Sequence, residues 1–155
     1  MPYASRMEPK AEDTDSIDGV VRALYATISG PAGPRDWTRL RPLFAPGARL
    51  LRTMHTAGTA TAHAMGVEDF VTIAGDNLAR AGFFEIEIAR RTEEFGHIAH
   101  VFSTYEARHS LEEPPFARGI NSVQLFFDGA RWQITSLLWD NETTENPIPG
   151  AYLTS

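Results

Sequence analysis

The residues of this sequence that could carry chemistry are a carboxylate, a phenol, an amide and a hydroxyl among apolar neighbours. Tyr105, Asn121, Ser136 and Asp140 lie in segments where apolar and polar residues alternate, as they do in β-strands. A carboxylic acid beside a phenol in an apolar cleft can have its pKa raised and serve as a general acid or base. Asn121 and Tyr105 could donate hydrogen bonds to negative charge that develops on an oxygen. This set indicates acid–base chemistry that needs no cofactor.

The same polar residues could instead form a hydrogen-bonded network inside the core. An unpartnered buried polar group costs about 1–3 kcal/mol, so polar side chains on an inner face must either pair with one another or meet a ligand. Asp140 also lies at the end of a predicted strand, beside Asn141 and Glu142, where water could reach it. The residues by themselves leave both a catalytic and a structural role open.

Composition narrows the classes of function. The 155 residues suffice for one domain with its own core. The absence of cysteine excludes disulfides, thiolate zinc sites and a cysteine nucleophile. Fourteen basic against twenty acidic residues give a net charge of −6 without any basic cluster, so we expect no nucleic-acid or membrane partner. No segment resembles a membrane span or a signal core, and we expect a cytoplasmic protein.

The five histidines do not predict a metal site. His97 and His100 would lie on opposite faces of one strand, so they could not bind one ion together. His55 and His63 occur in a segment whose structure is hard to predict, and they could approach the opening of a pocket. The sequence also has no glycine-rich phosphate loop and no nucleophile elbow. We therefore expect neither a metal nor another cofactor.

Three helices are predicted in the first half of the chain. Apolar residues recur there every three to four positions, which places them on one buried stripe of a helix. Asp15 and Asp36 are suited to cap the first two helices, and the glycines and prolines that follow each helix would end it. The predicted ranges are 15–28, 36–44 and 67–81. Between the last two we expect a brief strand over 48–52, and then an irregular strand or loop over 53–64.

The second half of the chain predicts a β-sheet. From Phe83 onward the apolar period changes from 3.6 to 2. Four strands fit this pattern, over 83–94, 97–109, 119–127 and 131–141. Phe95-Gly96 and Asp128-Gly129 are expected as two-residue turns between neighbouring strands. Helices followed by an antiparallel meander indicate an α+β fold.

The tight turns would determine which side chains share a face of the sheet. A two-residue turn at Asp128-Gly129 places Leu125 opposite Trp132, on the apolar face that should lie under the helices. By the same argument, Glu85 and Glu87 point away from that face. The inner face is then predicted to hold Tyr105, Asn121, Trp132, Ser136, Leu138 and Asp140.

Two further predictions concern the outer sheet face and the chain ends. The outer face would carry Ile120, Leu137 and Trp139 among polar residues, a composition that suits a homodimer interface, although a solvated face is the alternative. Residues 1–14 lack periodicity and are predicted to form a flexible arm before a domain over 15–142. The proline-containing tail, 143–155, should be extended. It could fold back over the domain or onto a partner, and disorder is the alternative.

The order of these features resembles the nuclear transport factor 2-like (NTF2-like) superfamily and, within it, the SnoaL-like branch. The segment 35–48 is similar to the short helix of that family that enters the first strand. Val67–Phe70 looks like the start of its third helix, and Asp128–Ile134 is similar to its final hairpin. The resemblance covers about residues 15–142. It implies three helices packed inside a strongly curved antiparallel sheet, a cystatin-like cone with an apolar cavity.

The resemblance implies a small-molecule pocket and leaves two kinds of function open. Catalytic members include isomerases, cyclases and dehydratases, in which a carboxylate, often with Tyr or His, works inside the cone; other members are association domains. Asp140 and Tyr105 occupy plausible places for the catalytic roles. A small hydrophobic or aromatic ligand would then be bound by Tyr25, His55, Phe70, Asn121, Trp132, Ser136 and Leu138. The alternative is a non-catalytic ligand-binding or dimeric association module.

Overall fold

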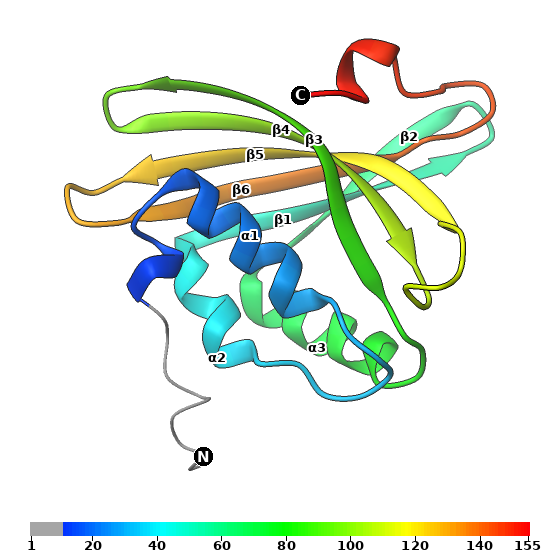
Figure 1. The fold of residues 1–155 in the computed structure, drawn as a ribbon, viewed down its shortest axis with the longest axis horizontal. Helices are drawn as coiled ribbons and strands as arrows, with labels where there is room; N and C mark the ends of the chain where they lie inside the picture. Colours follow the sequence, from blue (N-terminus) through cyan, green and yellow to red (C-terminus); the bar gives the residue numbers. More distant parts are fainter. Residues whose placement is uncertain (1–10) are drawn as a thin grey trace.

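A computed structural model describes residues 11–155 and shows three helices against one face of a curved six-stranded sheet (Figure 1). The predicted α+β class is confirmed. The helices are α1 (Ile17–Ile28), α2 (Trp37–Leu40) and α3 (Val67–Leu78). The strands are β1 (Phe44–Thr56), β2 (Thr59–Met65), β3 (Phe84–Phe95), β4 (Ile98–Arg108), β5 (Ala117–Phe127) and β6 (Trp132–Asn141).

Short polar side chains cap the first two helices. Ser16, one residue after the predicted cap, caps α1 and accepts a hydrogen bond from the backbone N–H of Gly19 at 2.9 Å. Asp36 caps α2 as predicted, by accepting from the backbone N–H of Arg39. The second helix is shorter than predicted because Pro42 has no N–H to continue the α-helical bonding. The chain runs through a 3₁₀ turn over Arg41–Leu43 into β1 instead.

The sheet is mixed, whereas the sequence predicted an antiparallel one. Its strand order is β2-β1-β6-β5-β4-β3, and every neighbouring pair is antiparallel except β1 and β6, which run parallel. The undecided segment 53–64 forms the end of β1 and most of β2. These strands meet in a tight turn at Ala57-Gly58, where both residues have positive φ angles of 45° and 85°. Such angles match the twist of a two-residue hairpin and explain the glycine there.

Both turns in the second half differ from the prediction. The β5–β6 loop has four residues, because Phe127 pairs with Trp132 and Asp128 accepts hydrogen bonds from the two N–H groups of residues 130 and 131. The β3–β4 turn lies at Gly96-His97, with Phe95 opposite Ile98. These changes move the pairing by an even number of residues, so by themselves they leave every side chain on its predicted face.

Two β-bulges reverse the predicted faces over half of each affected strand. In β6 the pairing jumps from Ile134 to Ser136, so Thr135 is an extra residue. In β3 it jumps from Glu87 to Ala89, so Ile88 is an extra residue. Beyond each bulge the side chains alternate in the opposite sense. The predicted inner positions of Ser136, Leu138 and Asp140 are therefore wrong, and so are the predicted outer positions of Glu85, Glu87, Leu137 and Trp139.

The C-terminal tail folds back over the outer sheet face (Figure 1). Thr104 Oγ1 on β4 donates to the carbonyl oxygen of Tyr152 at 2.6 Å, and the Tyr152 ring packs edge-on against Phe102 at 5.2 Å. Arg91 donates to the carbonyl oxygen of Ala151 at 2.5 Å. The tail therefore covers part of the face that the sequence suggested for a dimer.

Most of the predicted N-terminal arm, residues 1–10, lies outside the described residues. At its end, the carboxylate of Asp13 is buried and accepts from Arg39 Nε at 2.8 Å. The carbonyl oxygen of Thr14 accepts from the backbone N–H of Trp132 at 2.8 Å. These two residues are therefore part of the folded domain.

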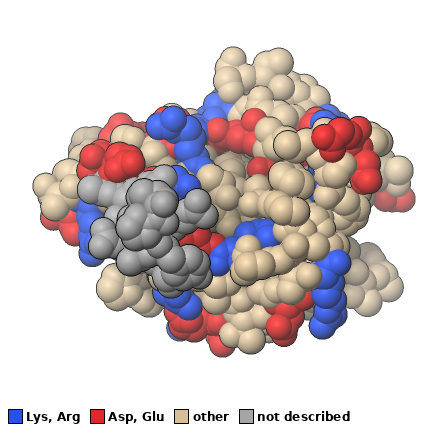
Figure 2. All heavy atoms as spheres, turned by 60° about the horizontal axis from the view of Figure 1, so that its bottom comes forward, with Lys and Arg blue, Asp and Glu red and all other residues tan. Residues whose placement is uncertain are grey.

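Acidic and basic side chains are interspersed on the side of the molecule that shows α2 and α3. Figure 2 shows no broad area of Lys and Arg among the described residues of this view. In the described part of the chain, no helix is long and apolar enough to cross a bilayer.

Candidate functional site

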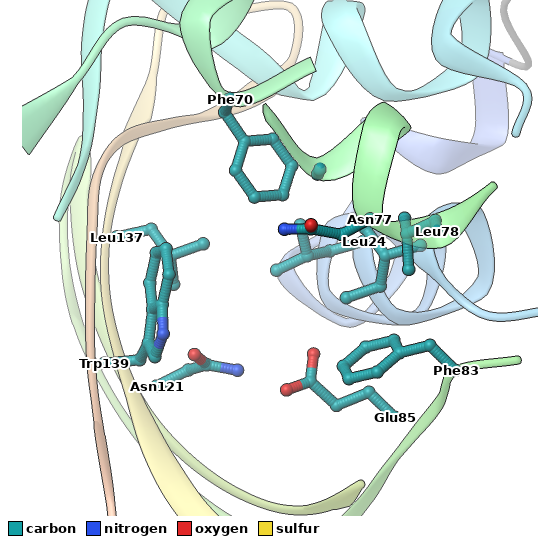
Figure 3. A pocket seen from close by; sticks show the side chains of 11 residues that line it. Leu24, Phe70, Asn77, Leu78, Phe83, Glu85, Asn121, Leu137 and Trp139 are labelled. Atoms are coloured by element: carbon teal, nitrogen blue, oxygen red, sulfur yellow. The ribbon is translucent and has the colours of Figure 1, made fainter. Parts of the chain in front are cut away.

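The inner sheet face and helices α1 and α3 enclose a cavity of about 230 Å³, here called the inner cavity (Figure 3). Its walls are mostly apolar, and three polar side chains interrupt them. Figure 3 shows Glu85 and Asn121 pointing toward one another at one end, with the amide of Asn77 entering from α3. The apolar wall includes Leu24, Phe70, Leu78, Phe83, Leu137 and Trp139.

Glu85 is the most unusual of these polar groups. The bulge at Ile88 turns it inward, opposite Ala107, and its backbone N–H donates to Ser29 Oγ at 3.0 Å. Among the described residues, its carboxyl group has neither a hydrogen bond nor an ion pair. Burial disfavours the charged form and raises the pKa of Glu85 from 4.5 to about 8. Near neutral pH this side chain is mainly a neutral acid that can donate a proton.

Asn121 is held by a buried chain of hydrogen bonds. Its Nδ2 donates to Tyr25 Oη at 3.1 Å, and Tyr25 Oη is 2.6 Å from Ser103 Oγ. Ser103 in turn donates to the carboxylate of Glu87, which Arg90 binds with its Nη2 at 2.8 Å. Because the single proton of Ser103 is directed to Glu87, Tyr25 must donate to Ser103. The phenol of Tyr25 therefore has no proton left for a ligand.

The hydroxyl of Tyr105 is hydrogen-bonded outside this chain of residues. Its hydroxyl donates to Asn141 Oδ1 at 2.5 Å. Burial, together with the nearby carboxyl of Glu85, raises the pKa of Tyr105 far above its usual range, so the phenol stays protonated. The ring crosses β5 at Gly119, where a Cβ would overlap both the Tyr105 hydroxyl and the carbonyl oxygen of Asp140. Glycine is therefore required at 119 by close packing.

A second hollow of about 270 Å³, the outer cavity, adjoins the first. The two share a wall that includes Phe70, Asn77, Glu85 and Trp139. Its other side is formed by the inward side chains of β1 and β2 and by Tyr105. Glu85 thus lies where the two hollows meet.

Three of the predicted site residues line these cavities, and a fourth lies behind the wall of the inner one. Asn121 and Phe70 line the inner cavity, Tyr105 lines the outer one, and Tyr25 is bound to Asn121. Trp132 is buried in the core instead, with its ring 5.1 Å from that of Phe127.

Asp140 and His55 lie together on the outer sheet face. Asp140 Oδ1 accepts from Thr53 Oγ1 at 2.8 Å and is 2.8 Å from His55 Nε2. Partial burial raises the pKa of Asp140, but the hydrogen bonds from His55 and Thr53 outweigh it and hold the pKa below its usual range. Asp140 is therefore an ionised carboxylate away from the cavity. Ser136 and Leu138 lie on the same outer face, so the bulge at Thr135 separates all three β6 residues from Tyr105.

Glu85, Asn77 and Trp139 are cavity residues that the sequence reasoning missed. Alternation of glutamate and isoleucine over 85–88 favours isoleucine inside, yet Ile86 is 40% exposed and Glu85 faces the cavity. No signal in the sequence marks the bulge that causes this. Among the described residues, no three His, Asp or Glu side chains are placed to hold a metal ion.

No family model matches the sequence, and no curated protein matches it. Solved structures match it by fold. An NTF2-like protein of unknown function from Silicibacter pomeroyi gives a TM-score of 0.58 at 14% identity, over 81% of this chain and 92% of that one. A protein of unknown function with a cystatin-like fold from Nostoc punctiforme gives 0.65 at 12% identity, over 89% and 97%. A candidate ketosteroid isomerase from Shewanella frigidimarina gives 0.56 at 17% identity, over 81% and 96%.

These similarities show the fold. The chain has the NTF2-like, cystatin-like architecture, as the resemblance in sequence implied. The SnoaL-like branch stays a prediction. Sequence identities this low do not show that two proteins share an activity, so the function has to be argued from the cavity.

The packing of Tyr105 over β5 predicts a specific cost for a methyl group at position 119. Gly119→Ala should lower the free energy of unfolding by about 1–3 kcal/mol, because the added Cβ displaces the Tyr105 hydroxyl or the neighbouring backbone. Gly75→Ala is the matched control, since its Cβ meets only the Trp37 ring at an ordinary 3.8 Å within a helix. It should be neutral or stabilising by up to about 1 kcal/mol. Equal effects in urea unfolding would contradict the assignment.

Glu85 predicts a pH dependence of stability. Between pH 5 and 8 the unfolded chain loses the Glu85 proton while the folded chain, with a pKa of about 8, keeps it. The folded state then binds more protons, so stability falls as the pH rises through this range. Relative to Glu85→Gln, which cannot titrate, the wild-type free energy of unfolding should decline from pH 5 to 8. Parallel stability curves for the two proteins would show that this carboxyl is not perturbed.

Proposed function

We propose that this NTF2-like chain binds a small, mainly apolar molecule in the inner cavity and transfers a proton on it, with Glu85 as the acid–base group. The observation that carries the proposal is the carboxyl of Glu85, which faces an apolar cavity without a partner among the described residues. Its pKa of about 8 places it near the pH at which a proton donor and acceptor is most effective. A structural carboxylate has its partners within the fold, as Glu87 does.

The cavity supports a ligand with one oxygen function. The inner cavity, at about 230 Å³, lies below the ~300–1,000 Å³ of pockets for drug-sized ligands, which favours a ring system of modest size. Asn121 uses one N–H on Tyr25, and its second N–H is left for a ligand oxygen. A carbonyl oxygen bound by Asn121 would leave the neighbouring α-hydrogen for Glu85. The ionised form of Glu85 would take that proton and later return it, while the amide N–H stabilises the charge that develops on the oxygen.

The buried network supports this role for Asn121. Because Tyr25 accepts from Nδ2 and donates to Ser103, the amide cannot rotate by half a turn without losing its hydrogen bond. Holding a donor in place before the substrate arrives avoids reorganisation during the reaction. Reactions that fit are isomerisation, cyclisation or dehydration next to a carbonyl, and these need only proton transfer.

The outer sheet face supports the second candidate, a dimeric association module. Ile98, Phe126 and Leu138 are 61%, 43% and 39% exposed there. Leu137 and Trp139 do not contribute, since they face the cavity. An exposed apolar group of this kind on a sheet suits a homodimer. Such a dimer is compatible with a ligand in the cavity on the opposite face.

Exchange of α-protons in a simple ketone tests the acid–base proposal directly. Wild-type protein should accelerate deuterium exchange into 2-tetralone, a small ketone fused to an aromatic ring, as followed by proton NMR. The rate should rise with pH, reach half its maximum near pH 8 and level off above it, because the ionised form of Glu85 is the base. Glu85→Gln should reduce the protein-dependent rate by about 10²–10⁴-fold, the usual contribution of a general base.

Asp140→Asn is the control for this experiment. It removes an ionised carboxylate from the outer face and should leave the exchange rate unchanged. A rate lost in Asp140→Asn but kept in Glu85→Gln would overturn the assignment of Glu85. Failure of the wild-type protein to accelerate exchange, with ligand binding intact, would favour the binding module.

The dimer prediction is tested by mass in solution. Light scattering should give twice the mass of one chain, and Phe126→Asp should give the mass of one chain by placing a charge in the apolar face. The matched control is Leu111→Asp, since Leu111 is 58% exposed in the loop between β4 and β5 and is not part of this apolar face. A wild-type protein with the mass of one chain would contradict the dimer.

A further inference from the structure

The outer cavity differs from the inner one in its charge. Arg52 on β1 and His63 on β2 lie directly opposite one another in the hairpin, and both line the outer cavity. Met54 and Met65 line the same side. Among residues 11–155, the only acidic side chain in this lining is Glu85, which burial keeps mainly neutral near pH 7. Arg52 and His63 therefore line the outer cavity, and no ionised carboxylate of the described chain lines it beside them.

Arg52 differs from most of the other described arginines of this acidic chain because it has no partner within residues 11–155, and it lines a cavity, unlike Arg80, which also lacks a partner there. Arg39, Arg41 and Arg118 each bind a carboxylate, at 2.8, 2.6 and 3.0 Å. Arg90, Arg108 and Arg131 also have carboxylate partners, and Arg35 donates to backbone carbonyls. Within residues 11–155, Arg52 has no hydrogen bond or ion pair. In a chain with a net charge of −6, a free guanidinium beside a cavity is a site for an anion.

The shared wall connects this charge to the proposed ligand. Phe70 and Trp139 border both hollows, so an elongated molecule could lie along them with one end in each. The inner end would meet Glu85 and Asn121, and the outer end would meet Arg52 and His63. Methionines adapt to ligands of different shape, so Met54 and Met65 could enclose the middle of such a molecule.

From this arrangement we infer that the ligand is amphipathic: an apolar ring body fills the inner cavity, and a carboxylate or similar anionic oxygen group at its outer end binds Arg52 and His63. The inference rests on the proposed function, because it names the substrate class of that site. A guanidinium can bind a carboxylate through two parallel hydrogen bonds, which would set the direction in which the molecule enters. Arg52 would be a specificity-determining residue, and the acid–base group remains Glu85.

A matched pair of probes tests the inference. 2-Naphthoate and 2-acetylnaphthalene have the same ring system and nearly the same size, but only the first is an anion at pH 7. Calorimetric titration should show tighter binding of naphthoate by the wild-type protein, and this preference should weaken as salt is added. Arg52→Gln should weaken naphthoate binding about three- to tenfold, as expected for a partly solvated ion pair. Binding of acetylnaphthalene should change less than twofold, which also shows that the variant is folded.

Arg80→Gln is the matched control. Arg80 follows α3, lines neither cavity, and likewise has no side-chain partner within residues 11–155, so its replacement changes the net charge equally. It should leave both affinities unchanged. Equal losses of naphthoate affinity in Arg52→Gln and Arg80→Gln would show that only the net charge of the protein matters, and would overturn the anion site.

The remaining outcomes separate this inference from the proposed function. Binding of acetylnaphthalene that is lost in Leu137→Phe, an uncharged change that adds volume to the inner cavity, together with no preference for naphthoate, would overturn the anion site and leave the cavity proposal standing. Binding of neither probe would overturn both. Naphthoate binding that depends on Arg52 and is lost in Leu137→Phe would support both.

Discussion

The arrangement of the site depends on one extra residue in each of two strands. Ile88 in β3 and Thr135 in β6 are unpaired in the hydrogen-bonded ladder, and each reverses the alternation of the residues beyond it. Without the bulge in β3, Glu85 would point to solvent and the cavity would contain an isoleucine. Without the bulge in β6, Asp140 would enter the cone and Trp139 would leave it. Local backbone geometry therefore determines which carboxyl group lines the inner cavity.

Two glutamates lie on the same side of β3, but only one of them has its charge compensated by partners within the fold. Glu87 accepts from Ser103 and binds Arg90, so its charge is compensated and it anchors the network that ends at Asn121. Glu85, two residues earlier, faces an apolar wall and its pKa rises to about 8. The network costs little because its buried members satisfy one another. The carboxyl group proposed to react is the one that this network does not include.

The inner and outer cavities present different groups to the proposed ligand. The inner cavity offers apolar area, an amide donor and a carboxyl group, whereas the outer cavity offers a free guanidinium beside an imidazole. Apolar burial would supply most of the affinity of the proposed ligand, and the charged group would set its direction. The outer sheet face is independent of both hollows. It carries its own exposed apolar residues and is partly covered by the C-terminal tail, so the proposed dimer and the proposed ligand would use opposite faces of one sheet.

The sequence alone determined the three helices, the last four strands, their order and the α+β class, because helical and strand periods extend over many residues and average out local exceptions. It left β2 undecided and did not show that β1 and β6 run parallel. Asp36 as a cap and the inward positions of Tyr105 and Asn121 followed from the same patterns. Only the tertiary structure decided the site. Side-chain alternation has a period of two, so a single unpaired residue exchanges the two faces, and nothing in the local pattern marks Ile88 or Thr135 as that residue. The pKa of a carboxyl group likewise depends on the distant segments that surround it in the folded chain, so it was decided by the tertiary structure.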